Sequence, residues 1–467
     1  MISALSLQYL RSHFGGEVIN ENVEFTSVSI NTRDINSGDC FVALKGDRFD
    51  AHEFLAAAVN AGVCAVVVDH AVDEISIPQW VVDDTTIALG HIAHAQRENF
   101  TGQLFAITGS SGKTTVKGML LSILQLAVGG AVFATQGNLN NHIGVPLTLL
   151  SLMKHHQYAV IEMGASALGE IDYLTRLADP DVALINNVMP AHIEGFGSMD
   201  NIATAKGEIY NGLSGNGVAI VNLDDHYAGQ WLLQNSQRKV ITFSKTEVAD
   251  ESDRASVRAT AVETGADGCA SFQLHFQGEQ FPVRLQVLGL HNVSNALAAA
   301  ACAYAANISV ASVVQGLQNF IGIDGRLQRL VGFKDAVVMD DSYNANPSSM
   351  RAAIDVLADA SARKIFIMGD MAELGESSLQ EHQDVGVYAK DKSIDVLLAV
   401  GTYSKAAVYG FSKNAIHYDN VEQLIIDAKK MADENTVFLI KGSRSSRMDI
   451  VVQALIQRGD NNASLAC

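Results

Sequence analysis

The residues best suited to chemistry form a glycine-rich turn between an expected strand and an expected helix. The stretch Gly109-Ser-Ser-Gly-Lys-Thr-Thr115 follows an apolar run over residues 103–108 and precedes apolar residues with helical spacing. Glycines let backbone N–H groups turn toward phosphate oxygens, and the start of a helix adds partial positive charge. The pattern predicts a nucleotide site, with Lys113 at the β and γ phosphates and the Thr114 hydroxyl on Mg²⁺. The residues assigned to it are Gly109, Ser110, Ser111, Gly112, Lys113, Thr114 and Thr115.

This loop is shorter than the common phosphate-binding pattern. That pattern has its first glycine five residues before the Gly-Lys pair, where this sequence has Ile107. Gly109 lies only three residues before Gly112, so the loop lacks two residues. A chance glycine turn remains the alternative, and the Lys-Thr-Thr start of the helix argues against it.

Three further side chains are candidates for the same edge of a sheet. Glu162 ends an apolar run over residues 158–163, which places a carboxylate at the ligand edge of a parallel sheet, opposite Thr114, as a Mg²⁺ ligand. His192 follows the next apolar run, although a lone histidine is more often structural than a ligand. Lys206 lies in a short helical segment and, on sequence alone, is expected to be a solvated surface lysine.

Apolar runs of strand length alternate with longer helical patterns along the chain, which is typical of doubly wound α/β sheets. The expected strands lie at residues 104–108, 158–163, 182–186, 218–222, 336–340, 364–368, 396–400 and 437–440. Residues 244–278 are polar with weak alternation and predict surface β-hairpins. We expect three α/β domains, over residues 1–83, 84–322 and 323–467.

Composition excludes some classes of protein. The 467 residues contain 51 acidic and 32 basic side chains, a net charge of −19, which argues against a protein that wraps nucleic acid. The sequence starts without a signal-peptide pattern, and its most apolar stretch, residues 119–134, is shorter than the ~20 residues of a membrane span. We therefore expect a cytoplasmic protein without nucleic-acid or membrane partners, and nothing in the sequence demands more than a monomer.

Several motifs together resemble the Mur ligase family, whose members are ATP-dependent amide-bond ligases that build the peptidoglycan precursor. These are the shortened loop, the strand ending at Glu162, the His192 loop, His291-Asn-Val-Ser-Asn295, Gly325-Arg-Leu327 and Asp340-Asp-Ser-Tyr-Asn-Ala-Asn-Pro347. The resemblance covers essentially the whole chain in the same order. It implies a small N-terminal UDP-sugar-binding domain, a central ATP-binding domain and a C-terminal Rossmann-like domain.

Three stretches favour the family member that adds D-alanyl-D-alanine to UDP-N-acetylmuramoyl-tripeptide through an acyl phosphate. They are Asn138-Leu-Asn-Asn-His-Ile-Gly-Val-Pro146, the Asp340 to Pro347 motif and Gly369-Asp-Met-Ala-Glu-Leu-Gly375. The alternatives are the related ligase that adds the third amino acid, folylpolyglutamate synthase, which lacks a UDP-sugar domain before its phosphate-binding loop, and a P-loop kinase or NTPase.

The resemblance also implies roles that the residues alone do not reveal. Lys206 matches a lysine that family members carry as a carbamate, which with His192 would help to hold a second Mg²⁺. Asn292 and Asn295 match the adenine-binding region, with a helix cap as the alternative role of Asn292. Arg326 and Asp341 would reach ATP when the third domain closes; alternatively each is an exposed loop charge.

The resemblance places the UDP-substrate site mainly in the first domain, with a solvated turn as the alternative. The matching residues are Asn31, Thr32, Arg33, Lys45, Gly46, Arg48, Phe49, Asn138, Asn140 and Asn141. Lys441-Gly-Ser-Arg444 follows a late strand and is expected to face the cleft. Contact with the dipeptide carboxylate and a role at a helix start are equally open for this stretch.

Overall fold

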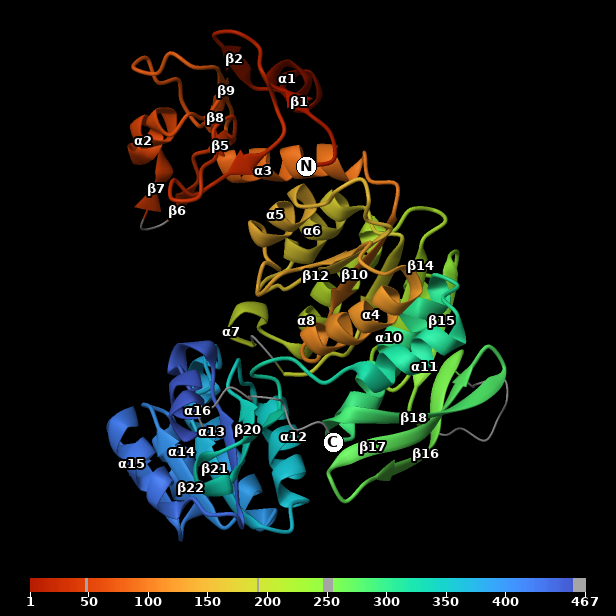
Figure 1. Cartoon of the computed structure of the whole chain (residues 1–467), viewed down its shortest axis with the longest axis vertical. Coiled ribbons are helices and arrows are strands. Elements are labelled where there is room, and N and C mark those ends of the chain that lie inside the picture. Colours follow the sequence, from red (N-terminus) through yellow and green to blue (C-terminus); the bar gives the residue numbers. More distant parts are fainter. Residues whose placement is uncertain (47–48, 191–192, 247–254, 457–467) are drawn as a thin grey trace.

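The computed structural model describes residues 1–46, 49–190, 193–246 and 255–456. Three α/β units follow one another along the chain, each built on its own sheet (Figure 1). The expected α/β fold class is confirmed. His192 and Arg48 lie outside the described residues.

The N-terminal unit contains a five-stranded sheet. In spatial order its strands are β2 (Glu17–Ile19), β9 (Gln79–Val81), β8 (Ala65–Val68), β5 (Cys40–Val42) and β4 (Val28–Ser29). Two short pairs flank it, β1 (Leu5–Ser6) with β3 (Glu24–Phe25) and β6 (Lys45–Gly46) with β7 (Phe49–Asp50). Its helices are α1 (Leu7–Phe14) and α2 (Leu55–Asn60).

The central unit contains a nine-stranded sheet. In spatial order its strands are β11 (Val132–Ala134), β12 (Tyr158–Glu162), β10 (Gln103–Thr108), β13 (Val182–Ile185), β14 (Val218–Asn222), β15 (Lys239–Ser244), β16 (Val257–Thr264), β17 (Cys269–Phe276) and β18 (Glu279–Leu288). Its helices are α3 (Thr85–Arg97), α4 (Lys113–Val128), α5 (Gly144–Leu150), α6 (Glu170–Ala178), α7 (Ile193–Phe196), α8 (Met199–Gly207), α9 (Ala228–Gln234), α10 (His291–Ala305) and α11 (Val310–Asn319).

Alternating side chains of the central strands supply two cores. On β10, Phe105 and Ile107 pack toward α4, α10 and α11, whereas Leu104 and Ala106 pack toward α5 and α6. The strands from β11 through β10 to β16 pair in parallel, and the inner strands β12, β10, β13 and β14 are buried on both faces and read as continuous apolar runs.

The hairpins expected within residues 244–278 are present, but their surface position is corrected. Strands β16, β17 and β18 pair antiparallel and extend the central sheet. Phe272, Leu274 and Phe276 of β17 are buried in the same core as α10. Their alternation with more exposed residues gives the stretch its polar character in sequence.

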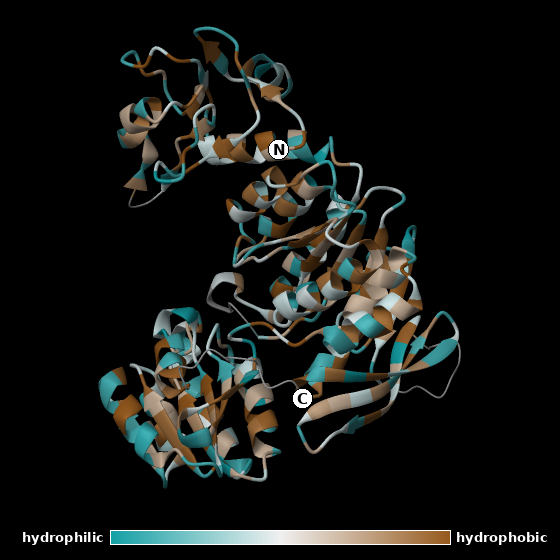
Figure 2. Ribbon diagram, in the orientation of Figure 1, coloured by the Kyte–Doolittle hydropathy of each residue, from teal (hydrophilic) through white to brown (hydrophobic). Residues whose placement is uncertain are grey.

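The C-terminal unit contains a six-stranded sheet. In spatial order its strands are β19 (Gln328–Val331), β20 (Val337–Asp341), β24 (Thr436–Lys441), β21 (Arg363–Met368), β22 (Val396–Val400) and β23 (Ala415–Tyr418). Helices cover both faces: α12 (Pro347–Ala358), α13 (Ser378–Asp391), α14 (Ser404–Phe411), α15 (Val421–Met431) and α16 (Asp449–Leu455). Figure 2 shows hydrophobic residues concentrated in the strands of this sheet.

Helix α3 joins the first two units through a shared core. Its residues Leu89 and Ile92 belong to one hydrophobic cluster that includes Trp80 of the N-terminal sheet and Leu149 of α5. Figure 1 shows α3 lying between the two units. In the described part of the chain, no helix is both long and apolar enough to cross a membrane.

The close contact between α4 and α11 gives a test of the core that carries the phosphate-binding loop. A Cβ at Gly316 of α11 would lie 2.6 Å from Cα of Ile123 in α4. We therefore expect Gly316→Ala to lower the melting temperature, at a cost of about 1–3 kcal/mol, because the helices must separate. Gly130→Ala is the control, since nothing lies within 4 Å of its added Cβ. Equal melting temperatures for the two variants would contradict this packing.

Candidate active site

The glycine-rich loop lies between β10 and α4, as expected. Gly112 is the N-cap of α4, with φ of +76°, and Lys113 begins the helix. The Lys113 ammonium donates a hydrogen bond of 2.8 Å to the Gly109 carbonyl oxygen, across the turn. The loop therefore presents a cation and the start of a 16-residue helix to the same space.

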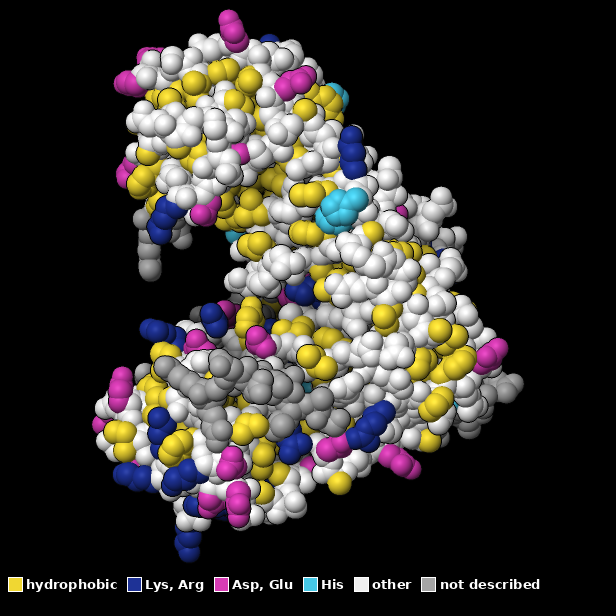
Figure 3. Space-filling view, in the orientation of Figure 1, with side chains coloured by type: hydrophobic (Ala, Val, Ile, Leu, Met, Phe, Trp, Pro, Cys, Tyr) yellow, Lys and Arg dark blue, Asp and Glu magenta, His cyan; other side chains and the backbone are white. Residues whose placement is uncertain are grey.

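That space is a cavity of about 530 Å³ between the central and C-terminal units. Figure 3 shows the surface deeply indented between the N-terminal and C-terminal units. The cavity brings together nearly all residues expected to bind ATP: Ser110, Ser111, Gly112, Lys113, Thr114, Thr115, Asn292, Asn295, Arg326 and Asp341. Gly109 meets them through its hydrogen bond from Lys113.

A chain of asparagine side chains holds the loop against α10. The Asn186 amide donates to the carbonyl oxygen of Ser111 and to Oδ1 of Asn295, both at 2.9 Å. Asn295 donates to Oδ1 of Asn292 at 2.8 Å, and Asn292 donates to the Leu288 carbonyl oxygen at 2.8 Å. Sequence reasoning missed Asn186, although it directly follows β13, where a parallel sheet places its ligands.

These amides also explain why Gly112 has no side chain. A Cβ there would lie 2.4 Å from Oδ1 of Asn295 and 2.5 Å from Nδ2 of Asn186. The positive φ of Gly112 disfavours other residues independently of that contact. Local backbone geometry and the asparagine chain therefore both require glycine.

Glu162 lies at the end of β12 and is buried, with 3% of its surface exposed. Its Oε1 accepts a hydrogen bond from Asn140 at 2.9 Å, and its Oε2 lies 3.3 Å from the Lys117 ammonium. Among the described residues, none donates a hydrogen bond to Oε2. Burial acts to raise the pKa of Glu162, but the charges of Lys113 and Lys117 outweigh it and hold the pKa below its usual value.

An ionised, buried carboxylate with an oxygen that accepts no hydrogen bond from the described residues fits a divalent cation. Oxygen ligands from one or two protein groups, completed by phosphate and water, suit Mg²⁺. The Thr114 hydroxyl starts the neighbouring helix and lies 3.5 Å from Nη2 of Arg326. Glu162 and Thr114 thus provide the expected pair of oxygens beside the phosphate-binding loop.

Lys206 is not the surface residue that the sequence alone suggests. It lies in α8 with 2% of its surface exposed. No described carboxylate forms an ion pair with its ammonium, which lies 6.0 Å from the ring centre of Phe196. Burial, and secondarily the charge of Lys113, lower the pKa of Lys206 to about 7. A large fraction of this amine is therefore uncharged and nucleophilic near neutral pH.

The C-terminal unit contributes residues to the phosphate side of the cavity. The Arg326 guanidinium contacts Thr114, as above, and stacks 4.1 Å above the ring of Tyr343. Asp341 ends β20, where its Oδ2 pairs with the Lys441 ammonium at 2.6 Å and its Oδ1 accepts from the Leu327 N–H at 3.2 Å. Arg326 and Asp341 are therefore held in place by contacts with neighbouring side chains and are not exposed loop charges.

Further cavity residues come from the ends of three adjacent central strands. Asn187 follows β13, His226 follows β14 and Lys245 follows β15. Oδ1 of Asn187 accepts the backbone N–H of Ser111 at 2.9 Å, which adds a second support to the loop. The signal that could have found these residues is their shared position at carboxyl ends of strands.

The residues expected to bind the UDP substrate lie mostly on the N-terminal unit, outside the cavity. Lys45 and Gly46 form β6, and Phe49 in β7 is 53% exposed and stacks on Phe54. Asn31, Thr32 and Arg33 form a separate turn, in which the Asn31 side chain donates to Asp34. Three of the expected residues belong to the central unit. Asn140 donates a hydrogen bond to Glu162, and the exposed Asn141 accepts one from the N–H of Gly144 at the start of α5. Asn138 is exposed.

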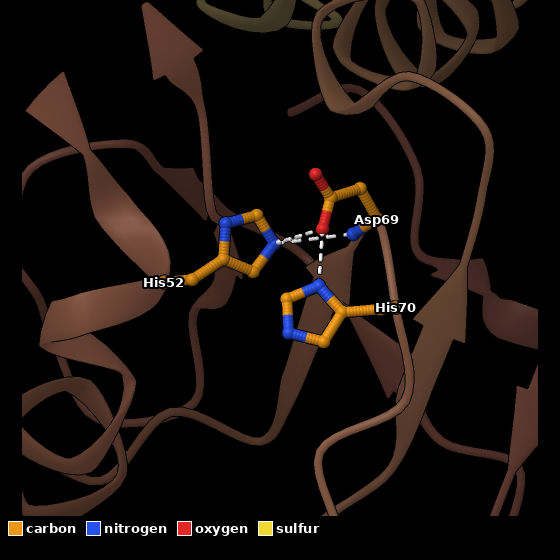
Figure 4. A group of neighbouring side chains, drawn as sticks. All are labelled: His52, Asp69 and His70. Atoms are coloured by element: carbon orange, nitrogen blue, oxygen red, sulfur yellow. Dashed lines mark hydrogen bonds and ion pairs between the residues drawn. The ribbon is translucent and has the colours of Figure 1, made fainter. Parts of the chain in front are cut away.

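A hydrogen-bonded group beside Lys45 fixes the geometry of this surface. Figure 4 shows the rings of His52 and His70 next to the Asp69 carboxylate. Nε2 of His52 accepts the N–H of Asp69 at 3.1 Å, so Nδ1 carries the proton that is donated to Asp50 at 2.6 Å. The same Nε2 lies 3.2 Å from Oδ1 of Asp69, so the group forms a compact polar support for this surface. The Lys45 ammonium lies 3.7 Å from Asp69 and 3.8 Å from Asp50.

The buried amine of Lys206 gives a prediction about stability. We expect Lys206→Met to raise the melting temperature at and below pH 7 in buffer free of CO₂, because the wild-type chain buries an ammonium there. The pKa is about 7 in the folded chain and 10.5 ordinarily, so the unfolded chain binds more protons between these values and wild-type stability rises with pH. The advantage of the variant should shrink from pH 7 to about pH 10.

Lys117→Met is the matched control for that experiment. It removes the ion-pair partner of buried Glu162 and should lower the melting temperature at pH 7 by several degrees. If Lys206→Met also lowered it at every pH, the account of Lys206 as an unpaired buried cation would be wrong.

Family comparisons agree with this architecture over most of the chain. The Mur ligase family catalytic domain matches residues 24–97, the Mur ligase middle domain matches residues 107–303 and the Mur ligase glutamate ligase domain matches residues 325–444. Each match falls on one of the three sheets described above.

Individual relatives match along almost their whole length. The chain is 41% identical to the UDP-N-acetylmuramoyl-tripeptide–D-alanyl-D-alanine ligase of Haemophilus influenzae, over 93% of this chain and 94% of the relative. Identity to the Escherichia coli enzyme of the same name is 40%, over 98% and 100%.

Solved structures give the same result. The crystal structure of MurF from Acinetobacter baumannii is 38% identical and superimposes with a TM-score of 0.89, over 97% of this chain and 98% of that one. MurF ligase from Thermotoga maritima in complex with ADP is 27% identical, with a TM-score of 0.81 over 92% and 96%. The resemblance found in the sequence motifs is confirmed, and the chain belongs to the Mur ligase family.

Proposed function

We propose that this chain joins D-alanyl-D-alanine to UDP-N-acetylmuramoyl-tripeptide, using ATP, to make the pentapeptide precursor of peptidoglycan. The observation that carries the proposal is the cavity in which the glycine-rich loop, Glu162 and the C-terminal Arg326 meet. The names of the relatives at 40–41% identity over nearly the full length support the choice of reaction.

The reaction needs an activated carboxylate, because a carboxylate is a poor electrophile near neutral pH. An oxygen of the tripeptide carboxylate attacks the γ-phosphorus of ATP, the bond to the ADP oxygen breaks, and an acyl phosphate forms. The dipeptide amine then attacks the acyl carbon, the carbon–oxygen bond to phosphate breaks, and the amine loses a proton. The protein contributes mainly positioning and charge neutralisation.

The described residues have distinct parts in these steps. Backbone N–H groups from Gly112 to Thr115 and the Lys113 ammonium bind the phosphates, while Arg326 neutralises charge from the opposite side. Glu162 and Thr114 are the ligands suited to Mg²⁺, which supplies charge neutralisation at the β and γ phosphates. Asp341 and the pair Asn292 and Asn295 border the part of the cavity assigned to ribose and adenine.

The environment of Lys206 supports its proposed modification. Its uncharged amine can attack CO₂, forming a nitrogen–carbon bond and releasing one proton, which converts a buried cation into a carbamate anion. An anion there would offset the charge of nearby Lys113, one cause of the lowered pKa of Lys206. With His192, the carbamate is the proposed ligand set for a second Mg²⁺.

The remaining assignments follow the same scheme. We assign residues 1–83 to UDP-sugar binding, 84–322 to ATP binding and 323–467 to the ligase domain that closes on ATP. In the first of these, Lys45, Phe49 and the turn at residues 31–33 offer the cations and the aromatic plane that a uridine diphosphate needs. The protein is proposed to act as a cytoplasmic monomer, where ATP is available and one chain supplies the whole cavity.

The reaction is tested by incubating the protein with ATP, Mg²⁺ and UDP-N-acetylmuramoyl-tripeptide, with and without amines. We expect phosphate release that requires D-alanyl-D-alanine. Mass spectrometry should show a product heavier than the UDP substrate by the mass of the dipeptide less one water. Release driven equally well by a single amino acid would instead indicate another family member. Release independent of any amine would indicate a plain NTPase.

Lys113→Ala is the control for that assay. Phosphate release should fall at least ~100-fold, because a charge-neutralising group at the transferred phosphate is lost. Its melting temperature should stay near that of wild type, since the removed ammonium bonds only one carbonyl oxygen among the described residues. Retained turnover would remove Lys113 from the reaction.

Carbamate formation on Lys206 has a spectroscopic test. In buffer containing ¹³C-bicarbonate near pH 8, the wild-type protein should show a carbamate carbonyl signal in its ¹³C spectrum. Lys206→Met should lack that signal, while Lys117→Met, with another buried lysine removed, should keep it. A signal unchanged in Lys206→Met would place the carbamate elsewhere.

A further inference from the structure

We infer that Arg444 binds the terminal carboxylate of the incoming dipeptide and thereby sets the length of the acceptor. This inference rests on the proposed function and names the acceptor-reading residue of that site. It assigns to Arg444 one of the two roles that the sequence leaves open for the stretch Lys441-Gly-Ser-Arg444.

Arg444 begins a one-turn 3₁₀ helix (Arg444–Ser446) within the loop at the edge of the C-terminal sheet that faces the cavity. The loop follows β24, whose last residue, Lys441, lines the cavity. In the sheet, β24 lies between β20 and β21, and ligands of open α/β sheets bind at the carboxyl ends of such central strands. The loop therefore borders the space that an acceptor must enter.

The backbone of this loop is fixed, whereas the Arg444 side chain is exposed. The Ser443 N–H donates to the Asp370 carbonyl oxygen at 2.8 Å, and the Ser446 hydroxyl donates to the same oxygen at 2.9 Å. Ser443 is buried, and Arg444 is exposed. A fixed backbone reduces the entropy that the side chain loses when it binds an anion.

A stack of two guanidiniums on one ring relates Arg444 to the reaction centre. The Tyr343 ring centre lies 4.1 Å from the guanidinium carbon of Arg326 and 5.8 Å from that of Arg444. The two guanidiniums are therefore no farther apart than the sum of these distances. Arg326 in turn contacts Thr114 of the phosphate-binding loop.

Space for an acceptor lies beside this ring. A second cavity, of about 440 Å³, is lined by Tyr343 and shares Thr114 and Arg326 with the nucleotide cavity. A dipeptide spans about 7 Å when extended. With its amine at the acyl carbon near Thr114, a dipeptide can extend its carboxylate toward Arg444, and it extends about twice as far as a single amino acid.

Two other cations beside the cavity are already paired with carboxylates. Lys441 is paired with Asp341, and Lys117 is paired with Glu162. Arg444 forms no ion pair with any carboxylate in the described part of the chain, although the whole chain carries a net charge of −19. A guanidinium that contacts a ring but pairs with no described carboxylate, with a fork that matches a carboxylate, is suited to an anionic ligand.

The test pairs a change in the enzyme with a change in the acceptor. Wild-type protein and Arg444→Met are compared with D-alanyl-D-alanine and with its C-terminal amide, which lacks the charge. The wild type should prefer the acid by about 10- to 100-fold in kcat/KM. Arg444→Met should lose that preference through a raised KM for the acid, while KM for ATP and for the UDP substrate stays unchanged. Arg444→Lys should retain part of the preference.

Arg447→Met is the matched control, since Arg447 is an exposed cation of the same loop, and it should keep the wild-type preference. A preference retained in Arg444→Met, or absent in the wild type, overturns the inference while the ligase reaction stands. If the wild type forms no dipeptide product at all, the proposed function itself fails, and this outcome is distinct from the other two.

Discussion

The buried carboxylate of Glu162 is the anion on which the rest of the site depends. Lys113, Lys117 and Arg326 all lower its pKa, so their positive fields converge on one position. Burying several cations near one another is costly unless an anion offsets them, and among the described residues Glu162 is the carboxylate that they share. Around Glu162, three cations therefore face one carboxylate, and this local excess of positive charge suits the position to the phosphates of a nucleotide and to the oxyanions formed from them.

The fold supplies this concentration of charge by bringing two sheet edges together. The carboxyl ends of β10, β12 and β13 present the loop, Glu162 and Asn186, while those of β20 and β24 present Asp341 and Lys441 from the other unit. Neither edge alone surrounds the cavity. The chain of asparagines and Asn187 keep the loop in place from behind; Asn187 accepts the N–H groups of Ser110 and Ser111, so the N–H groups at the start of α4 are the ones that face a ligand.

The parts of this arrangement that could be predicted from sequence depend on local patterns. Gly112 and Lys113 belong to one short stretch, and Glu162 follows an apolar run whose direction fixes where its side chain lies, so these positions were predictable, as was the α/β fold. The burial of Lys206 was not, because it depends on how α8 packs in three dimensions. Asn186 has no motif of its own, and it gains its role only when β13 pairs beside β10.

The continuous core through α3 has a consequence for which lengths of UDP substrate the protein accepts. Because Trp80 and Leu149 belong to one cluster, the N-terminal and central sheets cannot change their spacing without breaking that core. On the proposed assignment, the uridine binds to the N-terminal unit and the reacting carboxylate lies at the central unit. The fixed distance between these two units therefore selects UDP substrates whose peptide has the matching length. The C-terminal unit joins the central unit through a smaller apolar contact, in which Cys269 and Leu288 pack into the C-terminal core, so its spacing from the nucleotide loop depends on fewer residues.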